Sequence, residues 1–155
     1  MVRSVLLLSL FSILFTACNQ SATSVFKKDP IYAQNIQYTK LMKIVDANKT
    51  IKEILNITYL NSVDTKRYNK NQNFLVGIYS NNENNITNGV LTINKIKSID
   101  KIKVSKDDDI YKNIAFKNNW ADYYIYIFPN DNNEKLVVNY TVDDISSSIT
   151  FETEY

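Results

Sequence analysis

The sequence predicts an all-β domain folded as an antiparallel β-sandwich, or a mainly β domain with one short N-terminal helix. Apolar residues arrive in short runs that alternate with polar residues, and clusters of Asn, Asp, Ser and Lys separate the runs. The runs do not have the spacing of β-α-β units. The chain has 155 residues, 45% of them hydrophobic and 12% aromatic, which suits a single core. We expect one folded domain over residues 31–155.

An export signal is predicted for residues 1–17. Arg3 supplies a charged start, residues 5–15 form an apolar run, and two small residues precede Cys18. The apolar run is too short to cross a bilayer as a stable helix, which is typical of a cleaved signal. Residues 18–30 are small and polar without apolar periodicity, and this predicts a flexible tether.

The ending Phe15-Thr16-Ala17-Cys18 resembles the lipobox of bacterial lipoproteins. The resemblance implies cleavage before Cys18 and attachment of diacylglycerol to its thiol, with a further acyl chain on the amine in many bacteria. Two or more acyl chains hold a protein stably on a membrane. Asn19 follows the cysteine, where Asp is an inner-membrane retention signal in some Gram-negative lipoproteins, so we expect outer-membrane delivery, facing the periplasm or the cell surface.

The first segment of the domain, residues 33–48, is compatible with two kinds of secondary structure, a strand or a short helix. Residues 38–47 predict a strand, but Leu41, Met42, Ile44 and Val45 fit an amphipathic helix almost as well.

Seven further strands are predicted from alternating apolar residues. The clearest alternation is residues 135–142, where one face carries four large apolar side chains. The strands are centred on Leu55-Ile57-Tyr59, Phe74-Val76-Ile78, Leu91-Ile93, Ile102-Val104, Tyr123-Ile125-Ile127, Leu136 to Val142 and Ile149-Phe151.

Turn chemistry supports these strand boundaries. Asn-rich clusters at residues 48–49, 81–85, 88–89 and 130–133 lie between the runs, and with only two Gly we expect Asn to occupy the left-handed turn positions. The predicted architecture is similar to immunoglobulin-like or transthyretin-like sandwiches in strand number and spacing alone, because the antibody-type Cys pair is absent.

Composition disfavours most catalytic chemistry. The chain has no His and one Cys, so it has no imidazole base, no His zinc ligand and no disulfide, and acylation would consume the thiol. We expect no enzyme activity, no cofactor and no metal. The net charge of +2 predicts no nucleic-acid partner.

Two weak motifs have simpler explanations than catalysis or calcium binding. Ser98 and Lys101 match the S-x-x-K pattern of penicillin-recognising enzymes, but the other motifs of that class do not follow, and chance explains the match. Residues 107–109 and 143–144 are acidic and could supply calcium ligands if their loops met. We expect solvated turns instead.

Residues 120–129 form the most unusual strand, because both faces are apolar or aromatic. If Tyr123, Ile125 and Ile127 point inward, the opposite parity forms an outward aromatic stripe that could bind a sugar or a protein. The stripe would consist of Trp120, Tyr124, Tyr126 and Phe128. The alternative, which the pattern favours slightly, is a central strand whose second face is covered by residues 33–48.

Two extended sequons predict N-glycosylation in bacteria that use such a signal. Each has an acidic residue two before the Asn and Thr two after it: Asp46 with Asn48, and Glu83 with Asn85. Both acceptors fall in predicted turns, where a transferase reaches the chain.

These features predict a non-catalytic binding or structural module, held to the outer membrane by Cys18, that contacts an envelope or surface protein or a glycan. Small lipoproteins of similar length and anchor include adhesion-associated immunoglobulin-like proteins and transthyretin-like accessory lipoproteins of secretion machines. The alternatives are a periplasmic inhibitor or immunity-type lipoprotein and, less favoured, a His-independent hydrolase.

Overall fold

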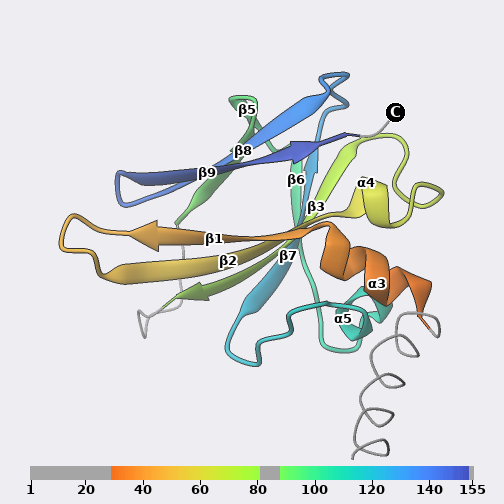
Figure 1. The fold of residues 1–155 in the computed structure, drawn as a ribbon, viewed down its shortest axis with the longest axis horizontal. Helices are drawn as coiled ribbons and strands as arrows, with labels where there is room; N and C mark the ends of the chain where they lie inside the picture. The colour runs from red at the N-terminus through yellow and green to blue at the C-terminus, as the bar shows by residue number, and fades with distance from the viewer. Residues whose placement is uncertain (1–28, 81–87, 154–155) are drawn as a thin grey trace, which may run out of the picture.

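The computed structural model describes residues 29–80 and 88–153 (Figure 1). The expected signal peptide, Cys18, most of the tether and the sequon at Asn85 lie outside the described residues. Over the described part the chain is mainly β, with two antiparallel sheets of five and four strands and a few short helices. The prediction of an all-β sandwich is confirmed.

The described part begins with helix α3 and a β meander. Asp29 caps α3 by accepting a hydrogen bond from the Tyr32 backbone N–H at 3.0 Å, and Pro30 occupies the first turn, where its missing N–H costs nothing. The elements are α3 (Pro30–Gln37), β1 (Thr39–Val45), β2 (Ile51–Tyr59), α4 (Leu60–Val63) and β3 (Gln72–Ser80). The strand predicted over residues 38–47 is confirmed by β1, and the helix alternative is wrong for Leu41, Met42, Ile44 and Val45, because α3 ends at Gln37.

The second half alternates between the two sheets. Its elements are β4 (Val90–Ile93), β5 (Ile96–Lys97), β6 (Asp100–Lys103), α5 (Asp109–Lys112), β7 (Asp122–Phe128), β8 (Lys135–Val142) and β9 (Ile145–Glu152). The seven predicted strands are present, β1 confirms the eighth, and β5 was not expected. Within the described residues no helix is long and apolar enough to span a bilayer.

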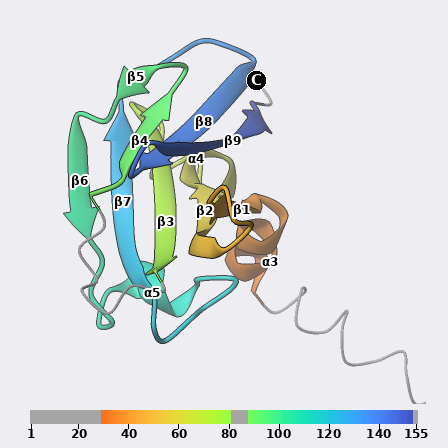
Figure 2. The ribbon, with the colours of Figure 1, turned by 90° about the vertical axis from the view of Figure 1, so that its left-hand side faces the viewer.

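Every strand pair in both sheets is antiparallel. The first sheet has the order β1-β2-β3-β7-β6 and the second the order β5-β4-β8-β9 (Figures 1 and 2). At one side β1 and β9 approach each other, where the Lys40 ammonium donates to the Thr150 carbonyl oxygen at 2.6 Å. At the other side the chain passes from β5 in the second sheet to β6 in the first.

The main core fills the space between the sheets. Both inner faces contribute fully buried side chains, with Phe74 packed edge-on against Phe128 and Phe151 at centroid distances of 6.1 and 5.4 Å. Burying these large apolar surfaces supplies the main driving force for closing the sandwich.

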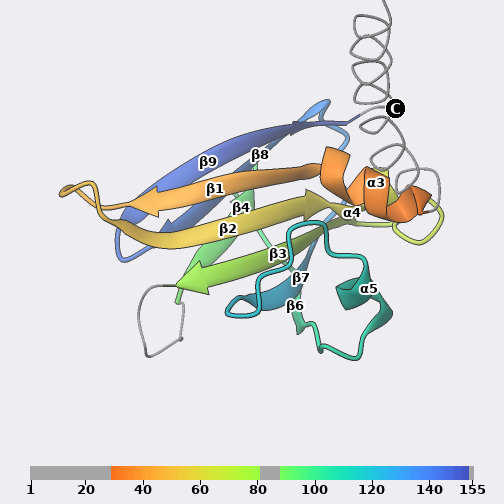
Figure 3. The same cartoon turned by 60° about the horizontal axis from the view of Figure 1, so that its bottom comes forward.

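A second, smaller core covers the outer face of the five-stranded sheet. It joins Leu75 and Tyr123 to Leu60, Val104 and Ile114. The segment between β6 and β7, which includes α5, lies across this face, as Figure 3 shows. Strand β7 is therefore covered on both sides, and this explains why its two faces are both apolar.

Among the described residues, left-handed backbone occurs at two Lys, two Asp and one Asn, so Asn supplies only part of what was expected of it. Asn94-Lys95 joins β4 to β5 and Asp143-Asp144 joins β8 to β9, and all four residues have positive φ. Two-residue hairpins with two positive φ values match the right-handed twist of their strands. Asp143 and Asp144 are thus turn residues.

Candidate binding edge

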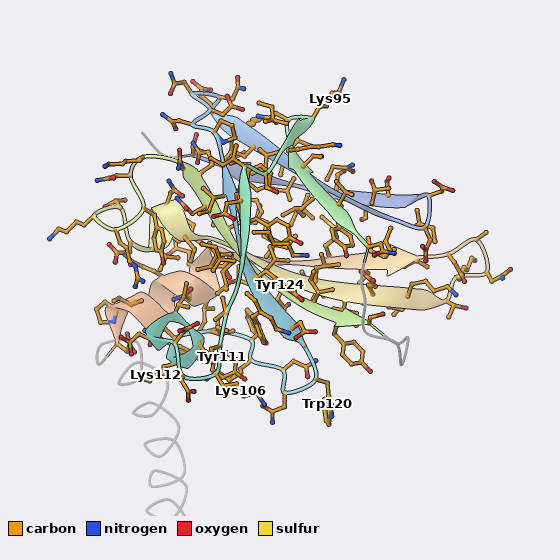
Figure 4. The ribbon with its side chains drawn as sticks, turned by 180° about the vertical axis from the view of Figure 1, so that it is seen from behind. Lys95, Lys106, Tyr111, Lys112, Trp120 and Tyr124 are labelled. Carbon is orange, nitrogen blue, oxygen red and sulfur yellow. The ribbon has the colours of Figure 1, made fainter. Side chains whose placement is uncertain are left out.

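The residues of the expected aromatic stripe lie in three different environments. Tyr126 and Phe128 are 3% and 1% exposed and belong to the main core, so the outward stripe is wrong for these two. Tyr124 is half-buried against the edge of that core. Trp120 is 81% exposed and points away from the body of the molecule (Figure 4).

The parity of β7 is the reverse of the one that would expose a stripe. The side carrying Tyr124, Tyr126 and Phe128 faces the second sheet, while Tyr123 faces the α5 segment. There the Tyr123 hydroxyl accepts a hydrogen bond from the Asn118 backbone N–H at 2.7 Å, and its ring packs edge-on against Tyr111. The second face is covered by residues 105–121 rather than by residues 33–48.

A run of lysines lies on the open side of the sandwich next to Tyr124. Residues 95–106, which we call the lysine edge, contain five lysines and one aspartate, a net charge of +4 in a chain whose total is +2. The lysines are Lys95, Lys97, Lys101, Lys103 and Lys106, and all five are exposed. The edge comprises β5, β6 and their flanking turns, with β6 the outermost strand of its sheet.

Two of these lysines are held against β7 by aromatic and ionic contacts. Lys101 lies opposite Tyr126 and Lys103 opposite Tyr124 in the β6–β7 register. The Lys101 ammonium is 4.2 Å from the centroid of the Tyr124 ring, within the range of a cation–π contact. The Lys103 ammonium is 3.0 Å from Asp122 Oδ1. The hydrogen bond and charge of Asp122 raise the pKa of Lys103, so this side chain stays protonated.

Apolar side chains are interleaved with the lysines. Ile96, Ile99 and Ile102 are 43%, 61% and 46% exposed. Ile102 was expected to be a core residue of its strand, but it lies at the open edge, where only Val104 at the end of the run is buried. The lysine edge therefore combines positive charge with exposed apolar surface.

A shallow polar groove adjoins the Lys95 end of the lysine edge. It has a volume of about 530 Å³ and is lined by Asn94 and by residues 132–135. Asn94 donates to Asp131 Oδ2 at 2.7 Å and accepts from the Val137 N–H at 2.9 Å. These hydrogen bonds hold the turn, so the Asn94 side chain has a structural role.

The weak motifs are accounted for by local contacts. The ammonium of Lys101, the lysine of the S-x-x-K match, lies over the Tyr124 ring. Asp108 Oδ2 accepts from the Ser105 N–H at 2.7 Å, and Asp109 pairs with Lys112 at 2.7 Å. Over residues 29–80 and 88–153 the structure brings together no group of three or more acidic or cysteine side chains that could hold a metal ion.

The sequon at Asn48 lies in the tight turn between β1 and β2. Asn48 is exposed, but its acidic partner is engaged, because Asp46 Oδ1 accepts from the backbone N–H groups of Asn48 at 2.9 Å and Thr50 at 2.8 Å. Asp46 also pairs with Lys52 at 3.3 Å, and these bonds lower its pKa. In the folded protein the carboxylate holds the turn.

No protein family matches the chain, and neither a curated protein nor a solved structure is significantly similar to it. The candidate site is therefore inferred from the residues of this chain alone. In the sequence, the lysine edge is indicated by the alternation of Lys and Ile across residues 95–103, a pattern that also fits a strand with one buried face.

Proposed function

We propose that the protein is a lipoprotein of the outer membrane whose sandwich is a non-catalytic binding module, and that the lysine edge contacts an anionic component of the cell envelope. The observation that carries the proposal is the placement of five exposed lysines on one open edge of an otherwise nearly neutral chain. Clustered surface charge steers partners of opposite charge and speeds their association. The lipid anchor at Cys18 would hold this edge within reach of envelope components.

Capture of cross-linked partners from intact cells tests the proposal. The full-length protein carrying Lys101→Gln with Lys103→Gln is compared with a control carrying Lys66→Gln with Lys70→Gln, two exposed lysines away from the edge. Each exposed charge contact contributes about 0.2 to 1 kcal/mol, and the edge variant loses two of them. We therefore expect it to bind its partner about 2- to 30-fold more weakly. The control keeps full binding. Equal capture by both variants contradicts the proposal.

Protease treatment of intact cells separates an adhesin from a periplasmic component. A module that faces the cell surface is cut, whereas a secretion accessory or periplasmic inhibitor is protected until the outer membrane is opened.

A further inference from the structure

We propose that the free side of β6 accepts an extended acidic peptide segment as an added strand. The inference rests on the proposed binding function and names the chemistry of the partner. Its guest would carry acidic side chains alternating with apolar ones.

Among the described residues, β6 is paired with another strand on one side only. Strand β6 is the last strand of its sheet, and Figure 2 shows it at the outer margin of the described part of the molecule. The Val104 N–H donates to the Tyr123 carbonyl oxygen at 2.8 Å, so Val104 and Ile102 bond toward β7. Successive residues of an antiparallel strand direct their backbone N–H and C=O groups alternately to one side and the other. The backbone groups of Lys101 and Lys103 therefore point to the free side. The Lys101 N–H donates to Asp100 Oδ1 at 2.7 Å, so within residues 29–80 and 88–153 the Lys103 N–H is the β6 donor that remains for a guest strand.

The side chains define what the guest must carry. Residues opposite each other in paired strands share a face. Guest residues opposite Lys101 and Lys103 would meet two ammonium groups, and the guest residue between them would meet Ile102, which is 46% exposed. An acid, an apolar residue and a second acid satisfy all three positions. A second copy of β6 would instead place lysine against lysine, and lysines on an edge oppose such pairing.

The lysine edge is a line rather than a plane. Lys95 and Lys106 lie at opposite ends of the molecule in Figure 4, with Tyr124 between them. Lys101 and Lys103 are also held against Tyr124 and Asp122 and are not gathered at one tip. A flat membrane touches one tip or face, whereas an extended peptide follows a line. The arrangement favours a peptide.

A matched pair of variants tests strand addition. Lys103→Gln removes the charge and keeps the N–H, whereas Lys103→Pro removes both, and proline is tolerated on an edge strand where the N–H faces outward. Full-length protein in neutral-lipid nanodiscs is titrated with a peptide in which Glu and Val alternate, and with the same peptide carrying a central Pro. We expect wild type to bind the first peptide and not the second, and Lys103→Pro to bind about tenfold more weakly than Lys103→Gln.

Hydrogen exchange gives a second measurement that needs no variant. The Lys103 amide should become protected when the alternating peptide is added. Lack of protection, or equal affinity of the Gln and Pro variants, overturns strand addition. If both peptides bind equally and the Lys101 and Lys103 substitutions still weaken partner capture, the binding edge stands and only the strand fails. Loss of peptide binding in nanodiscs containing phosphatidylglycerol would assign the edge to the membrane and overturn the inference.

Discussion

Tyr126 carries a hydroxyl group into the main core. Its side chain is 3% exposed, and its oxygen has no hydrogen-bond partner among the described residues. Burial raises the pKa of this phenol to about 12. A buried polar atom without a partner costs free energy, while the ring around it contributes packing.

We therefore expect opposite results from two substitutions of Tyr126. Tyr126→Phe removes only the unpartnered oxygen and should leave the free energy of unfolding unchanged or raised. Tyr126→Ala removes a packed ring and should lower it by about 3 to 5 kcal/mol. Urea titrations of both variants measure the difference. A large loss of stability in Tyr126→Phe would show that the hydroxyl has a partner in solution.

Glu53 is a second buried polar residue, 4% exposed on the inner face of β2. Burial raises its pKa and the charge of Asp143 adds to this, while a hydrogen bond with Tyr140 opposes it. A raised pKa in the folded state means that Glu53 favours folding when it is protonated. Its contribution is complete below the ordinary value of 4.5 and is lost as the pH rises through the raised value.

Glu53→Gln should remove this pH dependence. In wild type the free energy of unfolding should carry a component that falls as the pH rises above 4.5, and the Glu53→Gln variant should lack that component. Urea titrations at several pH values measure it. Glu134→Gln, which changes an exposed carboxyl, is the control and should behave like wild type. Parallel pH profiles for wild type and Glu53→Gln would contradict the assignment.

At the scale of elements, β3 and β7 depend on a glycine for their close approach. Gly77 lies directly opposite Tyr123, and a Cβ at Gly77 would lie 2.5 Å from Tyr123 Cε1. The φ of Gly77 is not positive, so the glycine is needed for space and not for backbone conformation. The Tyr123 ring covers the strand at this point.

Gly77→Ala should therefore lower the free energy of unfolding by about 1 to 3 kcal/mol, the usual cost of overpacking a well-packed site. The displaced Tyr123 ring should also expose the α5 segment, which hydrogen exchange over residues 105–121 would report. An unchanged denaturation midpoint would mean that the ring moves aside without cost.

For the whole molecule, the proposed lipid anchor at Cys18 would decide where the sandwich acts. Cys18→Ala should block acylation and signal removal together and leave a precursor that retains Arg3. Mass spectrometry of the membrane fraction distinguishes the precursor from the mature lipoprotein. Normal cleavage in the variant, or mature wild-type protein without lipid, would refute the lipoprotein assignment.

Glycosylation is the other modification to test on the intact chain. In a host with the extended-sequon pathway, we expect glycans at Asn48 and Asn85, detected as discrete additions to the intact mass. Asn48→Gln and Asn85→Gln should each remove one addition. Because Asp46 holds the folded turn, occupancy at Asn48 should be higher when the transferase meets the chain before folding. A single unmodified species from such a host contradicts both sites.

The fold class and every strand of the described residues except β5 could be predicted from the alternation of apolar residues along the chain. Side chains of a strand alternate between two faces, so residues 135–142 show their buried face directly, and the structure buries Leu136, Val138, Tyr140 and Val142 as the alternation predicts. Helix α3 is harder to predict, because its N-cap Asp29 lies in a small polar stretch typical of a tether.

The contacts on each face of β7 and the position of the open edge depend on the tertiary structure. Both faces of β7 are apolar, so periodicity could not tell the sandwich interior from the side under α5. The cover over Tyr123 comes from residues 105–121, whose position depends on how the sheets are ordered. Lys101 and Lys103 likewise become an edge only because β6 is the last strand of its sheet. Strand order is set by contacts between residues that are distant in the chain, and these contacts cannot be predicted from the local alternation of side chains.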